Sequence, residues 1–385
     1  MRMDKLKAEL NERRQAGLLR ELRPIQRRLH GRIVIDGREY LDCSSNDYLG
    51  LAGHHRLIAA AKEALDEFGV GAGASRLMTG SLALHHELEA KTARFKGKPA
   101  ALVFNSGYQA NVGIFAALAG RDDAVFCDRL GHASLIDGAL LAGCKLIRFR
   151  HNDTAHLSEL LASERRKYDR AWIVTESVFS MDGDRAPLKE LVALKEEHNC
   201  RLFVDEAHAT GLFGPDGAGV LSEEGLTDRV EVIMGTFSKA LGSFGAYIAS
   251  SRELVDYLVN ACRSFIYTTA LPPAVIAASS AAIDVVAAEP ERRRIVLESA
   301  ASFRKLLAQC NFLVHGESQI VPLVVGDNER ALRMAAQLRE AGYWVNAIRP
   351  PTVPSGEARL RFSFTWHHAP RELGSLMDAL LHVRV

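Results

Sequence analysis

A lysine stands at the centre of GTFSKALGSFG, the segment that runs from Gly235 to Gly245. The apolar run before it, from Val230, is typical of a buried strand that leaves the core at this point. This position would place the amine of Lys239 at the end of a sheet, where partial loss of solvent disfavours the ammonium form and lowers the pKa. Such an amine can form a Schiff base with an aldehyde. Taken alone, the segment is equally compatible with an ordinary surface lysine.

A second strand upstream also ends in chemically capable residues. The segment FVDEAHATG, residues 203–211, carries Asp205 and His208 at its exit. Pyridoxal phosphate requires a lysine for its aldehyde and a carboxylate that keeps its pyridine nitrogen protonated, so that the ring withdraws electrons from a carbanion. Lys239 and Asp205 together therefore predict pyridoxal phosphate as the cofactor.

A phosphate group would find donors at a strand-to-helix turn, NSGYQAN, residues 105–111. The backbone N–H groups of Gly107 and Tyr108 and the positive end of the following helix suit an anion. A simple helix cap is the alternative interpretation of this turn. Thr236 and Ser238, which both closely precede Lys239, would add hydroxyl contacts to the same phosphate.

Further candidates for contact with the cofactor ring follow other strands. His132, in DRLGHASL, would lie flat against a pyridine face. A lone histidine is more often structural, but Asp205 and Lys239 favour the functional interpretation. Ser180, in ESVFSMDGD, and His208 are placed to hydrogen-bond the ring oxygen, whereas Glu176 is equally well explained as a structural carboxylate.

Arginines are candidates for the carboxylates of a substrate, because a guanidinium binds a carboxylate through two parallel hydrogen bonds. Arg361, in EARLRFSF, suits the carboxylate of an amino acid, but strand alternation puts Arg359 on the same face and leaves the choice open. Arg20 and Arg349 are candidates for a second, distal carboxylate. For any single arginine, a surface role is the simpler explanation.

The elements that must position these residues form a βα alternation from residue 99 onward. Nearly continuous apolar strands separated by helices predict an α/β fold with a mostly parallel sheet that is covered on both faces. Ligands bind such sheets at the carboxyl ends of the strands, and the polar candidates follow five of these ends. The predicted strands are 100–104, 124–127, 145–149, 172–175, 202–204, 230–235 and 246–249, with helices at 109–118, 134–141, 156–163 and 188–197.

The rest of the chain predicts smaller elements around this sheet. An amphipathic helix covers residues 4–22, a hairpin turns at Asp36-Gly37, and a helix covers 54–68. The glycine-rich loop GVGAGASRLMTGS follows a helix rather than a strand, which argues against a dinucleotide site. After about residue 285 the pattern becomes that of a small α+β domain. We expect an N-terminal segment at 1–45, a large domain at 46–284 and a small domain at 285–385.

Composition excludes several classes of function. The 385 residues are 48% hydrophobic and 25% charged, with a net charge of +1, which gives no reason to expect nucleic acid or an anionic membrane as a partner. The two uncharged runs, 99–120 and 264–283, are interrupted by polar residues or prolines and do not resemble membrane spans. Six scattered cysteines show no metal-binding or redox spacing. We expect reduced thiols, no metal and a cytoplasmic location.

These segments resemble the blocks of a known family over essentially the whole chain. SNDYLGL, NSGYQAN, DRLGHASLIDGA, ESVFSMDGD, VDEAHATG and TFSKALG occur in the order found in the α-oxoamine synthases, which are fold-type I pyridoxal-phosphate enzymes. Several blocks are shared with 5-aminolevulinate synthase, serine palmitoyltransferase and 2-amino-3-ketobutyrate ligase. The segment AIRPPTVP, residues 347–354, is most similar to the 8-amino-7-oxononanoate synthase family of biotin biosynthesis.

The resemblance implies an activity and a set of partners. The reaction would be a decarboxylative condensation of L-alanine with a pimeloyl thioester, carried on coenzyme A or on an acyl carrier protein, to give 8-amino-7-oxononanoate, CO2 and free thiol. The enzyme would be an acyltransferase that acts as a homodimer with active sites at the subunit interface. The alternative is another α-oxoamine synthase that uses glycine or serine with a different acyl-CoA.

The resemblance also implies roles for individual residues. Lys239 would carry the cofactor, Asp205 would contact its pyridine nitrogen, and His132 would stack on its ring. The other positions with implied contacts to cofactor or substrate are His208, Ser180, Gly107, Tyr108, Thr236, Arg20, Asn46, Arg349, Thr352 and Arg361.

Overall fold

The computed structural model describes residues 3–368 and 370–383, which divide into two compact units. The large unit comprises Asp47–Ser180 and Arg185–Arg294, and the small unit comprises the chain up to Asn46, Met181–Asp184 and the chain from Ile295 onward. The sequence-based division instead keeps residues 1–45 apart and starts the C-terminal domain at 285. Long-range contacts group the N-terminal segment with the C-terminal part of the chain.

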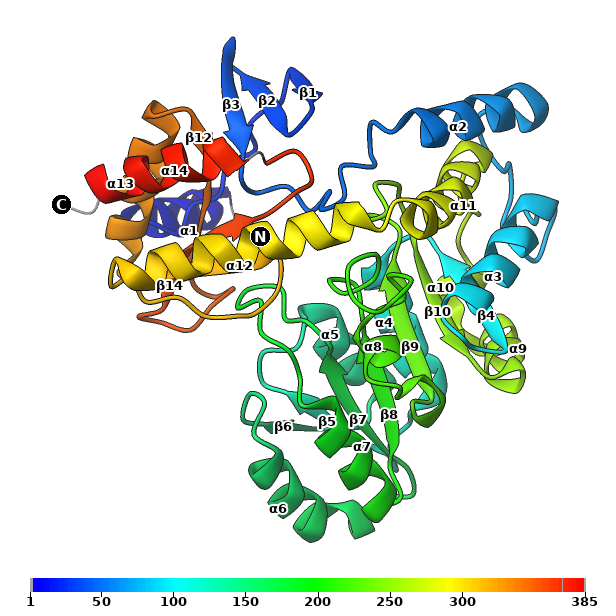
Figure 1. The fold of residues 1–385 in the computed structure, drawn as a ribbon. Coiled ribbons are helices and arrows are strands. Elements are labelled where there is room, and N and C mark those ends of the chain that lie inside the picture. The colour runs from blue at the N-terminus through cyan, green and yellow to red at the C-terminus, as the bar shows by residue number, and fades with distance from the viewer. Residues whose placement is uncertain (1–2, 369, 384–385) are drawn as a thin grey trace. The chain divides into compact units, whose positions relative to one another are not determined.

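The large unit is built on a seven-stranded sheet with the order β4-β10-β9-β8-β7-β5-β6 (Figure 1). Parallel pairs join β5 to β6 and β7, β7 to β8, and β8 to β9, while β10 runs antiparallel to both of its neighbours. The mostly parallel α/β fold expected from the sequence is confirmed. The strands are β4 (Ala100–Phe104), β5 (Ala124–Asp128), β6 (Lys145–Phe149), β7 (Ala171–Glu176), β8 (Arg201–Asp205), β9 (Val232–Thr236) and β10 (Ala246–Ser250).

The direction of β10 determines where the strand ends meet. Because β10 is antiparallel to β9 and to β4, those two strands run in the same direction. The strands β4, β5, β7, β8 and β9 therefore all have their carboxyl ends at one edge of the sheet, and each of them is buried along its whole length apart from the first residue of β8. The predicted convergence of five strand exits is confirmed.

Helices of the large unit connect these strands and cover the sheet. The predicted helices at 54–68, 109–118, 134–141, 156–163 and 188–197 are confirmed to within two residues at each end, whereas α3, α9 and α11 were not predicted. The helices are α2 (His55–Phe68), α3 (Ala83–Phe95), α4 (Gly107–Leu118), α5 (Ala133–Ala142), α6 (Thr154–Glu164), α7 (Leu188–Glu197), α8 (Val220–Glu223), α9 (Arg252–Ala261), α10 (Arg263–Ile266) and α11 (Pro273–Ala288).

A buried ion pair fixes the chain just beyond β8. Lys96 Nζ donates to Glu206 Oε2 at 2.5 Å and to the carbonyl oxygen of Ala218, and the side chains of Lys96 and Glu206 are 1% and 0% exposed. Burial alone would lower the pKa of Lys96, but the charge of Glu206 raises it above its ordinary value. Glu206 Oε1 also accepts the N–H of Leu221 at 2.9 Å. The residue after Asp205 is therefore held on both carboxylate oxygens.

The small unit contains two sheets. One has the order β1-β2-β3-β12 and the other has the order β11-β14-β13. The hairpin predicted at Asp36-Gly37 is confirmed, with Ile35 opposite Arg38 and positive φ angles of 52° and 74° at the two turn residues. The strands are β1 (Arg27–Leu29), β2 (Arg32–Ile35), β3 (Arg38–Asp42), β11 (Ile320–Gly326), β12 (Tyr343–Trp344), β13 (Asn346–Ile348) and β14 (Ala358–Ser363).

The helices of the small unit are α1 (Met3–Gln15), α12 (Glu291–Gln309, of which the part from Ile295 belongs here), α13 (Asn328–Glu340) and α14 (Pro370–His382). The first helix is shorter than the predicted 4–22, because Gly17 adopts a φ of 64° that ends helical geometry. None of its residues is buried, so the predicted amphipathic face covers no core in the described chain.

No single helix within residues 3–368 and 370–383 is both long and apolar enough to cross a membrane; only α11 and α12 taken together, as a bent pair, meet the length and composition. All six cysteines are free thiols, and all except Cys310 are buried.

A buried histidine of the small unit makes stability depend on pH. His368 is 3% exposed, its Nδ1 accepts the N–H of Thr365 at 3.3 Å, and its Nε2 contacts the carbonyl oxygen of Asp42 at 3.1 Å. Burial lowers the pKa of His368 to about 4, whereas an unfolded histidine titrates near 6.5. The unfolded chain therefore binds a proton between these values that the folded chain does not.

We expect this histidine to lower the free energy of unfolding as the pH falls from about 6.5 to 4, by on the order of 3 kcal/mol in total. Urea unfolding of wild type and His368→Gln at several pH values within this window measures the contribution as a difference in slope. Equal slopes for the two proteins would contradict the prediction.

Candidate active site

Asp205 and Lys239 follow neighbouring strands at the carboxyl edge of the large sheet. Asp205 is the last residue of β8 and is 4% exposed. Its Oδ1 accepts the N–H of Ala207 at 2.9 Å and its Oδ2 accepts a proton of Asn111 Nδ2 at 3.1 Å. Lys239 lies three residues beyond Thr236, at which β9 ends, and is partly buried. Hydrogen bonds thus orient the carboxylate toward the edge where the amine emerges.

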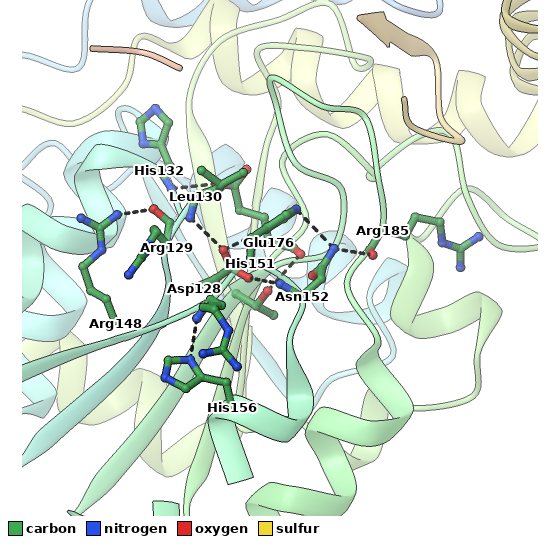
Figure 2. Close-up of polar contacts among 12 residues, drawn as sticks. Asp128, Arg129, Leu130, His132, Arg148, His151, Asn152, His156, Glu176 and Arg185 are labelled. Carbon is green, nitrogen blue, oxygen red and sulfur yellow. Dashed lines mark hydrogen bonds and ion pairs between the residues drawn. The ribbon is translucent and has the colours of Figure 1, made fainter. Parts of the chain in front are cut away.

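Glu176, at the end of β7, holds the segment that carries His132. Its Oε1 accepts the backbone N–H of His132 at 2.7 Å, as Figure 2 shows. Burial raises the pKa of Glu176 well above its usual range, the charge of Asp205 raises it further, and the ammonium of Lys239 opposes both effects. The structural role that the sequence left open for Glu176 agrees with this contact.

Asp128 holds the other end of the same segment. This fully buried carboxylate accepts the N–H of Leu130 at 2.8 Å, the Nδ1–H of His151 at 2.9 Å and the N–H of Asn152 at 2.9 Å (Figure 2). The loop from β5 to α5 is therefore tied down by two buried carboxyl groups, and the position of His132 at its end follows from them.

The imidazole of His132 lies among ionisable groups that shift its pKa. Loss of solvent lowers its pKa below the usual value; the charge of Asp205 opposes this, and that of Lys239 adds to it. His132 caps α5 by accepting the N–H of Ser134 on Nδ1 at 3.2 Å. Lys239 and Asp205 both act on the pKa values of His132 and Glu176, so the structure brings these four groups near one another.

His208 follows Asp205 closely in the sequence, and its ring forms a hydrogen bond with a tyrosine. Its Nδ1 is 2.7 Å from Tyr48 Oη, and the two residues are 7% and 0% exposed. Sequence reasoning noted the SNDYLGL segment but did not assign Tyr48 a contact. Ser180 is partly buried and is the last residue of the first segment of the large unit.

The start of α4 offers donors for a phosphate. Ser106 caps this helix by accepting the N–H of Gln109 at 3.2 Å, and the helix begins at Gly107. A Cβ at Gly107 would lie 3.0 Å from Thr236 Cγ2, so the glycine allows β9 to approach the helix end. The Oγ1 of Thr236 is buried and has no hydrogen-bond partner among the residues that the structure describes. Tyr108 is half exposed and donates to Asp137.

These features fit pyridoxal phosphate. The end of α4 supplies backbone N–H groups and the positive end of a helix dipole for a phosphate. Asp205 supplies a carboxylate and Lys239 an amine at the same edge. The hydroxyl of Thr236 makes no hydrogen bond within the described chain and is available as a donor to a ligand. Each donor type that the cofactor requires is present in the large unit.

In the small unit, the structure separates the two arginines between which the sequence could not choose. Arg359 is 1% exposed and forms ion pairs with Asp182 and with Glu357, the latter at 2.9 Å. The contacts of Arg361 include Asn46 Oδ1 at 3.4 Å and Ser363 Oγ at 2.7 Å. The charge of Arg359 is compensated by carboxylates within the fold, so its contacts are sufficiently explained by a structural role.

Arg20, Arg349 and Thr352 lie together in the small unit. Arg20 Nη2 donates to Thr352 Oγ1 at 3.0 Å, and Arg349 donates to the carbonyl oxygen of Gly17. Burial, and then the charge of Arg20, lower the pKa of Arg349. All three residues line a cavity of about 80 Å³, and the two arginines also line one of about 760 Å³. Two neighbouring guanidinium groups in a cavity suit an anionic ligand.

Comparison with known proteins agrees with this donor set. The aminotransferase class I and II family model matches residues 38–380. The chain is 48% identical over 378 residues to the 8-amino-7-oxononanoate synthase of Geotalea daltonii, which spans 97% of this chain and 96% of the relative. It is 47% identical over 378 residues, with the same coverage, to the enzyme of that name in Pelobacter propionicus.

Solved structures give the same result. A serine palmitoyltransferase of S. paucimobilis with bound PLP-myriocin aldimine is 34% identical, with a TM-score of 0.93 over 99% of this chain and 98% of that one. The 8-amino-7-oxononanoate synthase of Francisella tularensis is 28% identical, with a TM-score of 0.76 over 89% and 96% of the two chains. The chain belongs to the aminotransferase class I and II family and, within it, to the 8-amino-7-oxononanoate synthases.

Proposed function

We propose that this protein is a pyridoxal-phosphate enzyme that condenses L-alanine with a pimeloyl thioester to give 8-amino-7-oxononanoate, CO2 and free thiol. The observation that carries the proposal is the 46–49% identity over at least 97% of the chain to curated relatives of that name. Serine palmitoyltransferases match the fold closely but are only 32–34% identical. The identities therefore favour alanine and a pimeloyl group over serine and a longer acyl chain.

The large unit would hold the cofactor. The N–H groups at Gly107 and Tyr108 and the hydroxyl of Thr236 would bind the phosphate. Asp205 would accept a hydrogen bond from the protonated pyridine nitrogen, and His132 would lie against the ring. Ser180 and His208 would contact the ring oxygen. When bound, pyridoxal phosphate supplies an aldehyde for an amine and a ring that withdraws electrons from the substrate carbon next to it.

Lys239 would act as the general base that removes the proton from Cα of alanine and returns one after loss of CO2. Asp205 accepts two N–H groups, and these hydrogen bonds would hold its carboxylate in place opposite a positive ring nitrogen. His132, whose pKa is lowered by loss of solvent, would exclude water from one face of the ring.

The small unit would bind the substrate carboxylates. We assign the carboxylate of alanine to Arg361 with Asn46, and the distal carboxylate of the pimeloyl group to Arg20, Arg349 and Thr352. The contacts of Arg20 with Thr352 and the proximity of the two arginines support the second assignment. Coenzyme A and an acyl carrier protein are both compatible as carriers, since the thioester is the same.

We further propose a homodimer with shared active sites and a cytoplasmic location. Support for the dimer comes from large apolar side chains of the large unit that are exposed, which a second copy would cover. They are Val70 at 83%, Met78 at 74%, Tyr267 at 72% and Leu77 at 51%. Free thiols at all six cysteines agree with a reducing compartment.

The reaction itself is the first test. The purified protein with pyridoxal phosphate should release CO2 from L-alanine only when a pimeloyl thioester is present, and mass spectrometry should detect 8-amino-7-oxononanoate. Parallel reactions with glycine or serine and with palmitoyl-CoA separate the related activities. Faster turnover with serine and palmitoyl-CoA than with alanine and pimeloyl-CoA would contradict the proposal.

Replacing the lysine should abolish the chemistry. We expect Lys239→Ala to lose at least about 10³-fold in kcat, because general acid–base catalysis alone typically contributes 10² to 10⁴, and to change the visible absorbance of the bound cofactor. Lys145→Ala, at an exposed lysine at the start of β6, serves as the matched control. Wild-type turnover and spectrum in Lys239→Ala would refute the assigned role.

The two buried arginines of β14 should respond differently to the same change. Arg361→Lys loses two-pronged binding of a carboxylate, so we expect KM for alanine to rise about 10- to 100-fold. Arg359→Lys should leave KM for alanine within about twofold and lower the free energy of unfolding by roughly 1–3 kcal/mol, because its carboxylate contacts are structural. Steady-state kinetics and urea unfolding of both variants measure this, and the reverse pattern would refute the assignment.

A further inference from the structure

A continuous hydrogen-bonded chain joins the two groups that we place on the cofactor ring. Asn111 Nδ2 donates to Asp205 Oδ2 at 3.1 Å and to Ser134 Oγ at 2.9 Å. Ser134 Oγ in turn lies 2.7 Å from His132 Nδ1. All four residues belong to the large unit, and they come from the first two turns of α4, the start of α5, its cap and the end of β8.

The donors and acceptors along this chain leave one consistent arrangement. An amide nitrogen only donates, so Ser134 Oγ accepts from Asn111 and has its own proton for His132 Nδ1. The backbone N–H of Ser134 donates to the same Nδ1 at 3.2 Å. Two donors on Nδ1 require that it carry no proton. The neutral imidazole of His132 must therefore hold its proton on Nε2.

Asn111 is an unfavourable residue for a purely structural role. Asn111 is 1% exposed, and its Oδ1 is buried and accepts no hydrogen bond from any residue that the structure describes. Such an acceptor costs free energy that an apolar side chain would not. Turning the amide around would set Oδ1 against the carboxylate of Asp205, so the observed orientation is the only one compatible with that neighbour. The contact with Asp205 and Ser134 is thus what the side chain contributes.

We propose that Asn111 and Ser134 are positioning residues that couple Asp205 to His132, fixing the carboxylate under the pyridine nitrogen and the imidazole in its Nε2–H form against the ring. This inference rests on the proposed function, because it takes the placement of Asp205 and His132 around pyridoxal phosphate from there. It assigns roles to two residues for which neither motif nor comparison provides one.

The charges around His132 act in both directions: Lys239 lowers the pKa of the imidazole, whereas Asp205 and Asp137 raise it. The groups that face it are Asp205 at the end of β8, Lys239 beyond β9, Glu176 at the end of β7, Asp137 on α5 and Tyr108 on α4, whose ring lies 6.3 Å away. Protonation at Nδ1 would break two hydrogen bonds at once. Removing the hydroxyl of Ser134 should therefore make the imidazole easier to protonate.

The test uses the apoprotein and cofactor binding, so it does not depend on turnover. Nitrogen-15 NMR of histidine-labelled protein, with the His132 signal assigned from His132→Asn, reports the tautomer and the pKa. We expect the Nε2–H form in wild type and a measurable rise of the His132 pKa in Ser134→Ala. We also expect Asn111→Leu to weaken pyridoxal phosphate binding about 10- to 100-fold, because it removes a hydrogen bond to a charged group.

A control and a double variant make the outcome decisive. As a control, Thr92→Val removes a fully buried hydroxyl that, unlike that of Ser134, has no hydrogen-bond partner in the described chain. This variant should leave the His132 pKa and cofactor affinity unchanged. If the hydrogen-bonded chain couples Asp205 to His132, the double variant Asn111→Leu/Ser134→Ala should lose less affinity for pyridoxal phosphate than the product of the two single fold-losses. Wild-type tautomer, pKa and affinity in folded single variants would overturn the inference. A wild-type protein that fails to bind pyridoxal phosphate would instead overturn the proposed function.

Discussion

The site depends on the shared direction of five strands. A residue just beyond the carboxyl end of a parallel strand is carried to the same sheet edge as its counterparts on neighbouring strands, whatever their separation in sequence. The strand β10 lies between β4 and β9 and preserves this arrangement. Because it is antiparallel to both, β4 and β9 run in the same direction. The turn before α4 and the lysine beyond β9 therefore lie at one edge although more than a hundred residues separate them.

Buried charge distinguishes structural from functional groups in both units. Arg359 is compensated by two carboxylates, and Lys96 by Glu206, so the charges of these side chains are satisfied within the fold. Asp205 accepts hydrogen bonds from two neutral N–H groups, and Arg20 and Arg349 approach each other. An ionic group that is surrounded by neutral donors or by like charge is suited to a ligand of opposite charge.

Much of this could be predicted from residue types and local order. The apolar runs located all seven strands of the large sheet, and the lysine and aspartate beyond two of them identified the cofactor. Tyr48, Asn111 and Ser134 could not be found in that way, because each acts through a contact with a residue distant in sequence or in another element. The choice between Arg359 and Arg361 needed the position of Asp182, and the early end of α1 followed from a single glycine angle.

The ion pair between Lys96 and Glu206 constrains how this chain can change over evolution. Either side chain alone would leave an uncompensated charge in a place that water does not reach, so a single replacement is costly while a joint apolar replacement need not be. The two positions should therefore vary together among homologues, although they are 110 positions apart in sequence. Glu206 directly follows Asp205, and Lys96 lies on the connection from α3 to β4. Evolutionary change next to this aspartate is therefore constrained by a residue on another connection.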